Sequence, residues 1–299
     1  KTVDLKNHLT GEVTTEKYDK LVLSPGAAPI RPPLPGIDLP GIFSVRTVPD
    51  AKHIREWLDR DTINTGMNEY SGVNSIAKPK NAVVVGGGFI GLEMVENLID
   101  RGLNVILIEK LDQVMPPLDP EMALVVKRYM EKHRVRVELS DGVAGFRNSA
   151  DGMIEVLTES GKVYPAEIVI LAIGVKPETE LAKMAGLELG KRGGFKVDDQ
   201  MRTSNPDIFA VGDAVEVKDF ITGEWTLIPL AGPANRQGRI VADVICGRDS
   251  HYRGTQGTSI CKIFEAAISQ TGVSEKTLKR IGETDYEKIY TYPNSHAGY

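Results

Sequence analysis

At residues 81–93 the chain reads Asn-Ala-Val-Val-Val-Gly-Gly-Gly-Phe-Ile-Gly-Leu-Glu. Its β-branched run predicts a buried strand that leads directly into the spacing Gly-x-Gly-x-x-Gly at residues 86–91. Apolar side chains then recur with helical spacing between Ile90 and Ile99, and Arg101-Gly102 is typical of a helix end. Strand, tight turn and helix in this order predict the opening of a βαβ unit that binds a dinucleotide.

Each glycine of the motif has a physical role in such a unit. Gly86 permits the tight turn, and Gly88 lets the backbone approach a pyrophosphate without a Cβ in the way. Gly91 lets the helix pack close to the strand. The N-terminus of the helix then presents free N–H groups and a partial positive charge to the phosphates.

The next strand, at residues 104–108, ends in an acid at the distance that the motif requires. Glu109 lies 23 residues after Gly86 and would accept hydrogen bonds from the hydroxyls of the adenosine ribose, which favours NAD. Lys110 weakens this preference, because a cation there could accept the 2′-phosphate of NADP. A lone glycine motif also occurs in ordinary turns, but the strand before it, the helix after it and the acid together favour dinucleotide binding.

The unit continues with a helix and a further buried strand. Asp119 has the character of a helix N-cap, and Pro120 and Glu121 suit the first turn that follows it. The apolar run at residues 167–173 predicts a strand that ends in Gly174. A glycine there can let the backbone lie against a bound cofactor, although plain strand termination explains it nearly as well.

Two other segments end in the same way. Residues 18–23 read as a strand followed by Ser-Pro-Gly, and residues 208–211 read as a strand followed by Gly-Asp. The carboxylate of Asp213 would sit where backbone donors could hold it. Taken alone, Asp213 is more typical of a capping residue at a turn.

Composition narrows the class of protein. The 299 residues contain 36 Lys and Arg and 41 Asp and Glu, and the formal charge of −5 argues against a partner that is a nucleic acid. No run approaches the roughly 18 apolar residues of a membrane span, so we expect no membrane partner. The two cysteines, Cys246 and Cys261, are too few for a disulfide framework or a Cys-rich zinc site, and we interpret both as small packed residues and expect no metal. No secretory pattern follows Lys1, and we expect a cytoplasmic protein.

Five motifs in order resemble the flavin-dependent pyridine nucleotide–disulfide oxidoreductases. The likeness is greatest to the branch that contains coenzyme A-disulfide reductases, NADH oxidases and NAD(P)H-dependent polysulfide reductases. The motifs are Leu-Ser-Pro-Gly-Ala at 23–27, Val-Val-Gly-Gly-Gly-Phe-Ile-Gly-Leu-Glu at 84–93, Ala-Ile-Gly-Val-Lys-Pro at 172–177, Phe-Ala-Val-Gly-Asp-Ala at 209–214 and Pro-Leu-Ala-Gly-Pro-Ala-Asn-Arg-Gln-Gly-Arg at 229–239.

The resemblance implies an α/β fold with two nested Rossmann-like dinucleotide-binding domains, of which the FAD part is incomplete, plus the start of an α+β dimerisation domain. The implied order is a partial FAD-binding domain at 1–60, a linker loop at 61–78, an NAD(P)H-binding Rossmann domain at 79–194, the second part of the FAD-binding domain at 195–254 and the beginning of the truncated dimerisation domain at 255–299.

The resemblance also assigns roles to residues near the two rings. Phe89 stands where the branch usually has a tyrosine that covers the flavin, Ile90 would touch the nicotinamide, and Glu93 would lie near its carboxamide unless it is a core glutamate without ligand contact. Asp213 should bind the ribityl chain of FAD. The other implied FAD-site residues are Ser24, Gly26 and Arg46, with Leu230 and Ala231 beside the flavin ring. No residue of this chain is assigned a catalytic role with certainty.

Two parts of the family's sequence that are not found in this chain affect the expected function. The family's first glycine motif and its redox cysteine would lie before Lys1, and the dimerisation domain stops early. The intact protein is expected to be a homodimer that passes hydride from NADH, or from NADPH, to FAD and on to coenzyme A disulfide or polysulfide. The alternatives are an NADH oxidase that reduces oxygen and an inert NAD-binding fragment.

Overall fold

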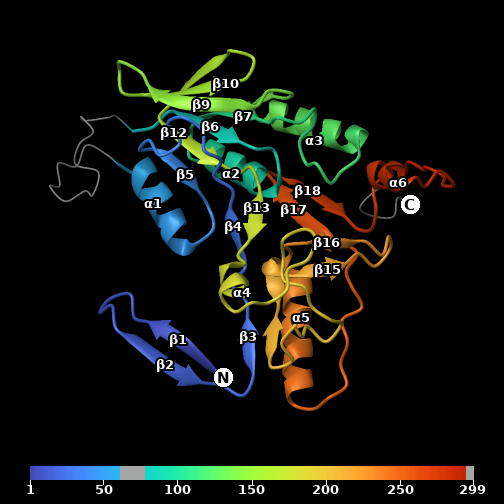
Figure 1. Cartoon of the computed structure of the whole chain (residues 1–299). Coiled ribbons are helices and arrows are strands. Elements are labelled where there is room, and N and C mark those ends of the chain that lie inside the picture. Colours follow the sequence, from blue (N-terminus) through green and yellow to red (C-terminus); the bar gives the residue numbers. More distant parts are fainter. Residues whose placement is uncertain (61–77, 294–299) are drawn as a thin grey trace.

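The computed structural model describes residues 1–60 and 78–293, and its largest sheet has five parallel strands in the order β5-β12-β6-β7-β8 (Figure 1). Val83 is paired with Ile106 on one side and with Val169 on the other. The strands are β5 (Ile42–Ser44), β6 (Asn81–Val85), β7 (Asn104–Ile108), β8 (Arg136–Glu138) and β12 (Ile168–Leu171). The βαβ unit expected from the glycine motif is confirmed, with α2 (Phe89–Asp100) as its helix.

Both faces of this sheet are covered. Ala82 and Val84 face a core that includes the buried sides of α1 (Val48–Leu58), α2 and α3 (Pro120–Lys132). Val83 and Val85 face a second core beneath an antiparallel sheet. Its strands are β9 (Val143–Asn148), β10 (Ile154–Thr158) and β11 (Val163–Ala166). Because β6 is covered on two sides, it reads as a continuous apolar run instead of alternating.

A second lobe has its own core. In it β3 (Leu21–Leu23) pairs in parallel with β14 (Ile208–Ala210), and both pack near α5 (Ala231–Ile245). Val22, in the middle of β3, is 41% exposed, which is unusual for a strand of a parallel sheet. The remaining elements of this lobe are the hairpin of β1 (Thr2–Lys6) and β2 (Val13–Lys17), the hairpin of β15 (Glu216–Lys218) and β16 (Trp225–Leu227), the 3₁₀ turn η1 (Gly212–Ala214) and α4 (Glu180–Met184).

A narrow antiparallel ribbon joins the two lobes. Figure 1 shows β4 (Ala27–Pro29) and β13 (Val175–Pro177) running side by side between the upper, sheet-containing lobe and the lower one. The backbone of Ile30 donates to the carbonyl of Gly174 and extends this pairing by one residue, at 3.0 Å. The last residues of the ribbon therefore lie beside the carboxyl ends of the parallel strands.

The C-terminal part packs on the upper lobe. The hairpin of β17 (Ser259–Ile263) and β18 (Ala266–Gln270) contributes Cys261 and Ile263 to the core around α2. The helix α6 (Glu275–Ile281) follows. Asp119 stands at the N-cap position of α3 as expected, but its side chain makes no capping bond to that helix. Its carboxylate instead accepts from the backbone N–H groups of Glu275 and Lys276, at 3.0 and 3.1 Å, where α6 begins.

The α/β class with a parallel sheet is confirmed. The domain boundaries stay predictions, although β5 and α1, which fall within residues 1–60, lie on the sheet of the upper lobe. The linker residues 61–77 and the last residues 294–299 lie outside the described part of the chain. Among the residues described, no helix is long and apolar enough to cross a membrane.

The two cysteines have different surroundings. Cys261 is buried as expected, and burial, with a smaller contribution from Glu93 and Glu96, raises the pKa of its thiol. The expectation that Cys246 is also packed is wrong, because its side chain is exposed at the C-terminal end of α5.

Candidate functional site

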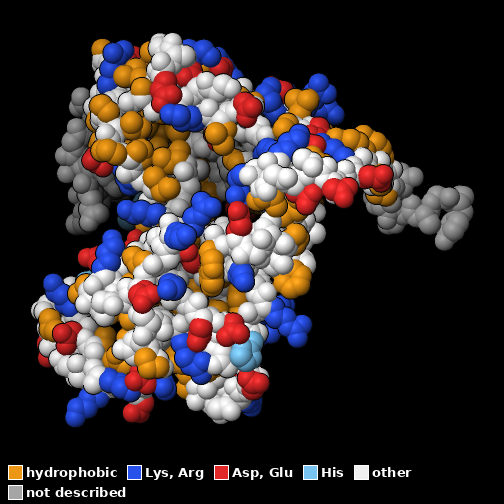
Figure 2. Space-filling view, turned by 45° about the vertical axis from the view of Figure 1, so that its right-hand side comes forward, with side chains coloured by type: hydrophobic (Ala, Val, Ile, Leu, Met, Phe, Trp, Pro, Cys, Tyr) orange, Lys and Arg blue, Asp and Glu red, His pale blue; other side chains and the backbone are white. Residues whose placement is uncertain are grey.

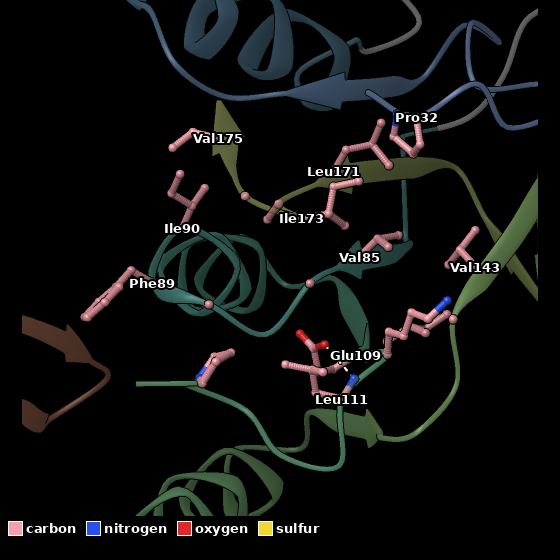
Figure 3. Close-up of a pocket in the computed structure, with 18 of the residues that line it drawn as sticks. Pro32, Val85, Phe89, Ile90, Glu109, Leu111, Val143, Leu171, Ile173 and Val175 are labelled. Carbon is pink, nitrogen blue, oxygen red and sulfur yellow. Dashed lines mark hydrogen bonds between the residues drawn. The ribbon is translucent and has the colours of Figure 1, made fainter. Parts of the chain in front are cut away.

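A cleft of about 1120 Å³ opens between the two lobes. Its walls come from the β6–α2 turn, the ends of β7 and β12, and the loop before α5. Figure 3 shows Phe89 and Ile90 at the start of α2, with Val85 and Ile173 on one side of the turn and Glu109 and Leu111 on the other. In the space-filling view, hydrophobic side chains gather on the upper part of the molecule above a band of Lys and Arg side chains (Figure 2). The volume is that of a site for a large ligand.

The three glycines of the motif have different surroundings in the β6–α2 turn. Gly86 has a φ of +107°, and a Cβ there would overlap the carbonyl oxygen of Ala172. A Cβ on Gly91 would overlap the carbonyl oxygen of Gly86, so Gly91 is needed for close packing of α2 on β6. A Cβ on Gly88 would meet no atom within 4 Å among the described residues. Gly88 therefore borders open space, as expected where a ligand approaches the backbone.

The N-terminus of α2 is left open toward the cleft. Gly88 is the N-cap, no side chain of the described residues caps the helix, and its first turn contains no acidic residue. The first N–H groups of a helix have no partner within the helix, and together with the helix dipole they favour an anion. The turn thus fits the diphosphate of a dinucleotide.

Glu109 is tied to the glycine turn from the end of β7. One carboxylate oxygen accepts from the backbone N–H of Gly87 at 2.6 Å, and the other accepts from the N–H of Leu111 at 2.8 Å. The side chain is buried, yet it lines the cleft. Each oxygen of a carboxylate has two lone pairs, so both can accept further bonds from ribose hydroxyls. The predicted ribose contact is compatible with this geometry. The bond from Gly87 could not be predicted from the sequence.

Two acidic residues that sequence reasoning missed line the same cleft as Glu109. Asp141, after β8, and Glu159, at the turn between β10 and β11, both line the cleft. Glu159 forms an ion pair of 2.8 Å with Lys110. Neither acid belongs to a local motif, because each reaches the cleft from a different loop. Both loops lie at the carboxyl end of the sheet, where a ligand is expected to bind. This placement follows from the topology of the sheet and not from the local sequence.

The residues expected at the flavin divide into two sets. Arg46, Asp213 and Leu230 line the cleft, and the guanidinium of Arg46 donates to the carbonyl of Pro25 at 2.9 Å. A Cβ on Gly26 would lie 2.9 Å from that guanidinium, so Gly26 makes room for Arg46. Ser24, Gly26 and Ala231 are not among the lining residues.

The residues expected at the nicotinamide also divide. Phe89, Ile90 and Gly174 line the cleft, and Gly174 has a φ of +105°, which explains the choice of glycine without any ligand. Glu93 is exposed on α2 and is not a lining residue. The interpretation of Glu93 as a core glutamate is wrong, and its contact with a carboxamide stays a prediction.

The cleft contains groups that fit both of the cofactors that the sequence implies. Open space at Gly88, the uncapped helix and Glu109 fit an adenosine diphosphate. Asp213, Leu230 and Arg46 supply polar and apolar groups from a second side of the same cleft. Both groups of residues therefore face one continuous space, as a nicotinamide stacked on a second ring system requires.

Comparisons with known proteins agree with this geometry. The family model described as pyridine nucleotide-disulphide oxidoreductase matches residues 1–238. An NADH oxidase of Methanocaldococcus jannaschii is 40% identical over 267 residues, which are 88% of this chain and 55% of that protein. A CoA-dependent NAD(P)H sulfur oxidoreductase of Pyrococcus abyssi is 32% identical and covers 96% of this chain and 61% of its own length.

A solved structure also matches most of the chain. The crystal structure of reduced Bacillus anthracis CoADR-RHD has 48% sequence identity and a TM-score of 0.85. The match covers 94% of this chain and 47% of the chain in that structure. The chain therefore spans between 47% and 61% of the length of these three proteins.

Proposed function

This chain belongs to the pyridine nucleotide-disulphide oxidoreductase family of FAD-dependent NAD(P)H oxidoreductases, and we propose that the whole protein passes hydride from NADH or NADPH to FAD and on to a disulfide-type acceptor. The observation that carries the proposal is the single cleft that joins the open glycine turn at Gly88 to Asp213 and Leu230. Two cofactor sites that share one cleft are what transfer between two bound rings requires.

The residues of this chain have distinct parts in the proposal. The N–H groups at the start of α2 bind the diphosphate of the dinucleotide, and Glu109 binds the adenosine ribose. Phe89 and Ile90 flank the nicotinamide, while Asp213 and Leu230 hold the flavin side. The flavin held there would supply the redox chemistry, namely uptake of hydride from the nicotinamide and release of the electrons to the acceptor. The apolar wall of Leu171, Ala172 and Ile173 keeps water from the space where the rings meet.

The relatives suggest two acceptors for the proposed reaction. The relative from Pyrococcus abyssi is a CoA-dependent NAD(P)H sulfur oxidoreductase. We therefore propose coenzyme A disulfide or polysulfide as the acceptor, reached through a cysteine outside this chain. Oxygen is the second candidate, because the relative from Methanocaldococcus jannaschii is an NADH oxidase. A different possibility is that the 299-residue chain alone binds the nucleotide without catalysis, because it spans only 55% and 61% of the length of these two relatives.

The proposed architecture has two nested dinucleotide-binding units followed by the start of a dimerisation domain, in a homodimer. The second lobe supplies part of the FAD unit, and the exposed side chain of Val22 leaves one face of β3 uncovered, where a further element of that unit would pack. The hairpin β17–β18 and α6 would open the dimerisation domain.

Stopped-flow mixing of the full-length protein with NADH tests the proposal. Anaerobic loss of flavin absorbance is expected, and its failure would overturn the hydride transfer. Rapid oxygen consumption without a thiol substrate would instead favour the NADH oxidase. A purified 299-residue chain that is colourless but binds NADH would show that this part alone is inert.

A further inference from the structure

The adenosine end of the cleft is rich in carboxylates. Glu109, Asp141 and Glu159 all line it, and the described lining residues supply one ammonium group there, that of Lys110. The other cation of the lining, Arg46, donates to Pro25 on the flavin side. A 2′-phosphate, which carries a charge of about −1.5 to −2 at pH 7, would therefore depend on Lys110 for a counter-charge.

Glu159 is held in place to pair with Lys110. Its backbone N–H donates to the carbonyl of Gly142 at 2.7 Å. A Cβ on Gly142 would lie 2.6 Å from the carboxyl carbon of Glu159, so this glycine lets the side chain lie against the backbone. The carboxylate then reaches Lys110 at 2.8 Å.

The neighbouring turn fixes this arrangement. Asp141 is 4% exposed, and it accepts from the backbone N–H of Ser160 at 3.1 Å and from its hydroxyl at 2.6 Å. Burial alone would raise the pKa of Asp141, but these bonds from Ser160 lower it below its ordinary value. Asp141 therefore stays ionised at neutral pH and anchors the residue that follows Glu159.

The ion pair contributes little to stability. The side chains of Lys110 and Glu159 are 69% and 52% exposed, and pairs in such positions add little to folding free energy. Its effect on a ligand is different. A carboxylate next to Lys110 neutralises the ammonium group that the described lining residues offer to a 2′-phosphate, and it also repels that phosphate. NADH has a neutral hydroxyl at this position and is indifferent to the pair.

We infer that Glu159 is a specificity-determining residue that favours NADH over NADPH by pairing with Lys110 at the adenosine end of the cleft. The inference rests on the proposed function, since it concerns the nucleotide that this cleft binds. Glu109 favours a ribose hydroxyl, because its carboxylate accepts hydrogen bonds. Glu159 disfavours a phosphate, because its ion pair with Lys110 leaves the phosphate without a counter-charge.

Nucleotide titrations of the 299-residue chain test the inference, with NADH and NADPH as the two probes and calorimetry as the readout. For Glu159→Gln we expect the Kd for NADPH to fall about 10-fold, because one carboxylate close to the phosphate is removed and Lys110 is released. The Kd for NADH should stay within about 2-fold. The gain for NADPH should shrink as salt is raised, because it comes from exposed charges.

Two further variants separate the explanations. Glu155→Gln removes an acid of β10 that pairs with Arg147 outside the cleft lining, and it should change neither Kd. In a Lys110→Met background, Glu159→Gln should improve NADPH binding by a clearly smaller factor, because only the repulsion between carboxylate and phosphate is then removed. An unchanged NADPH affinity in Glu159→Gln, or an equal gain without Lys110, would overturn the inference. If the unaltered chain binds neither nucleotide, the proposed function fails instead.

Discussion

Gly88 and Gly91 stand three residues apart, yet their substitution by alanine should affect different properties, namely ligand binding for Gly88 and stability for Gly91. A Cβ at position 91 would overlap the carbonyl oxygen of Gly86, and the helix would have to move off the strand. We expect Gly91→Ala to lower the free energy of unfolding by ~1–3 kcal/mol, the usual cost of overpacking. Urea denaturation of the purified chain measures this loss.

Gly88→Ala provides the matched comparison. Its Cβ would meet none of the described residues within 4 Å, so the free energy of unfolding should change little. The methyl group would stand where the diphosphate approaches, and we expect NADH binding to weaken about 10-fold, or ~1.4 kcal/mol. Equal destabilisation by the two substitutions would contradict the assignment of Gly88 to the ligand and Gly91 to packing.

The same residues show what a sequence can reveal about a site. Gly86, Gly88, Gly91 and Glu109 were predictable because strand, turn and helix are continuous in the chain and the acid ends the next strand. Glu159 was not, because its position beside Lys110 depends on how the β10–β11 turn folds back over Gly142. Spacing along the sequence thus indicates a glycine motif and its acid, but it does not indicate contacts between residues of distant loops.

At the scale of elements, the segment after α6 is attached to the upper lobe by charge. Lys288 pairs with Glu121 of α3 at 2.5 Å and with Glu275 of α6 at 2.7 Å. Hydrogen bonding to Lys288 is the main reason that the pKa values of Glu121 and Glu275 fall from 4.5 to about 2. The sequence did not indicate this network, because its three members come from different elements.

The lowered pKa values predict how the attachment depends on pH. A carboxylate whose pKa is lower in the folded protein stabilises it fully above its unfolded pKa, and the contribution disappears as the pH falls through the folded value. Protection of the α6 amides from hydrogen exchange, corrected for intrinsic rates, should thus hold from pH 7 to 4.5 and decline toward pH 2.

A pair of lysine variants provides the control for this prediction. Lys288→Met should reduce the protection of α6 already at pH 7, as should 1 M salt, which screens exposed charges. Lys132→Met removes an exposed lysine at the other end of α3 and should have no effect. Circular dichroism would identify global unfolding at low pH. Unchanged protection in Lys288→Met would mean that other contacts, such as the bonds from the start of α6 to Asp119, attach this helix, and not the ion pairs of Lys288.

The whole molecule consists of two lobes with separate cores joined by the β4–β13 ribbon (Figure 1). The sequence predicted the α/β class, since the apolar strands and glycine turns repeat in the required order. It did not indicate that β5 and α1 join the upper sheet, because their pairing with β12 spans more than a hundred residues. The side chain of Trp57 reinforces this pairing by donating to the carbonyl of Glu167 at 2.9 Å.

Each lobe contains one of the two tryptophans, so their unfolding can be followed separately. Trp57 is buried in the upper core, and Trp225 is 47% exposed on β16 of the lower lobe. With ADP-ribose at 100 times its Kd, the upper lobe should gain ~2.7 kcal/mol of stability. We expect the unfolding midpoint of a Trp225→Phe variant, which reports on Trp57, to rise in urea. The midpoint of Trp57→Phe, which reports on Trp225, should stay constant because the predicted diphosphate and ribose contacts all lie in the upper lobe. A common shift of both midpoints would show that the lobes unfold as one cooperative unit, and that the ribbon couples them more strongly than their separate cores imply.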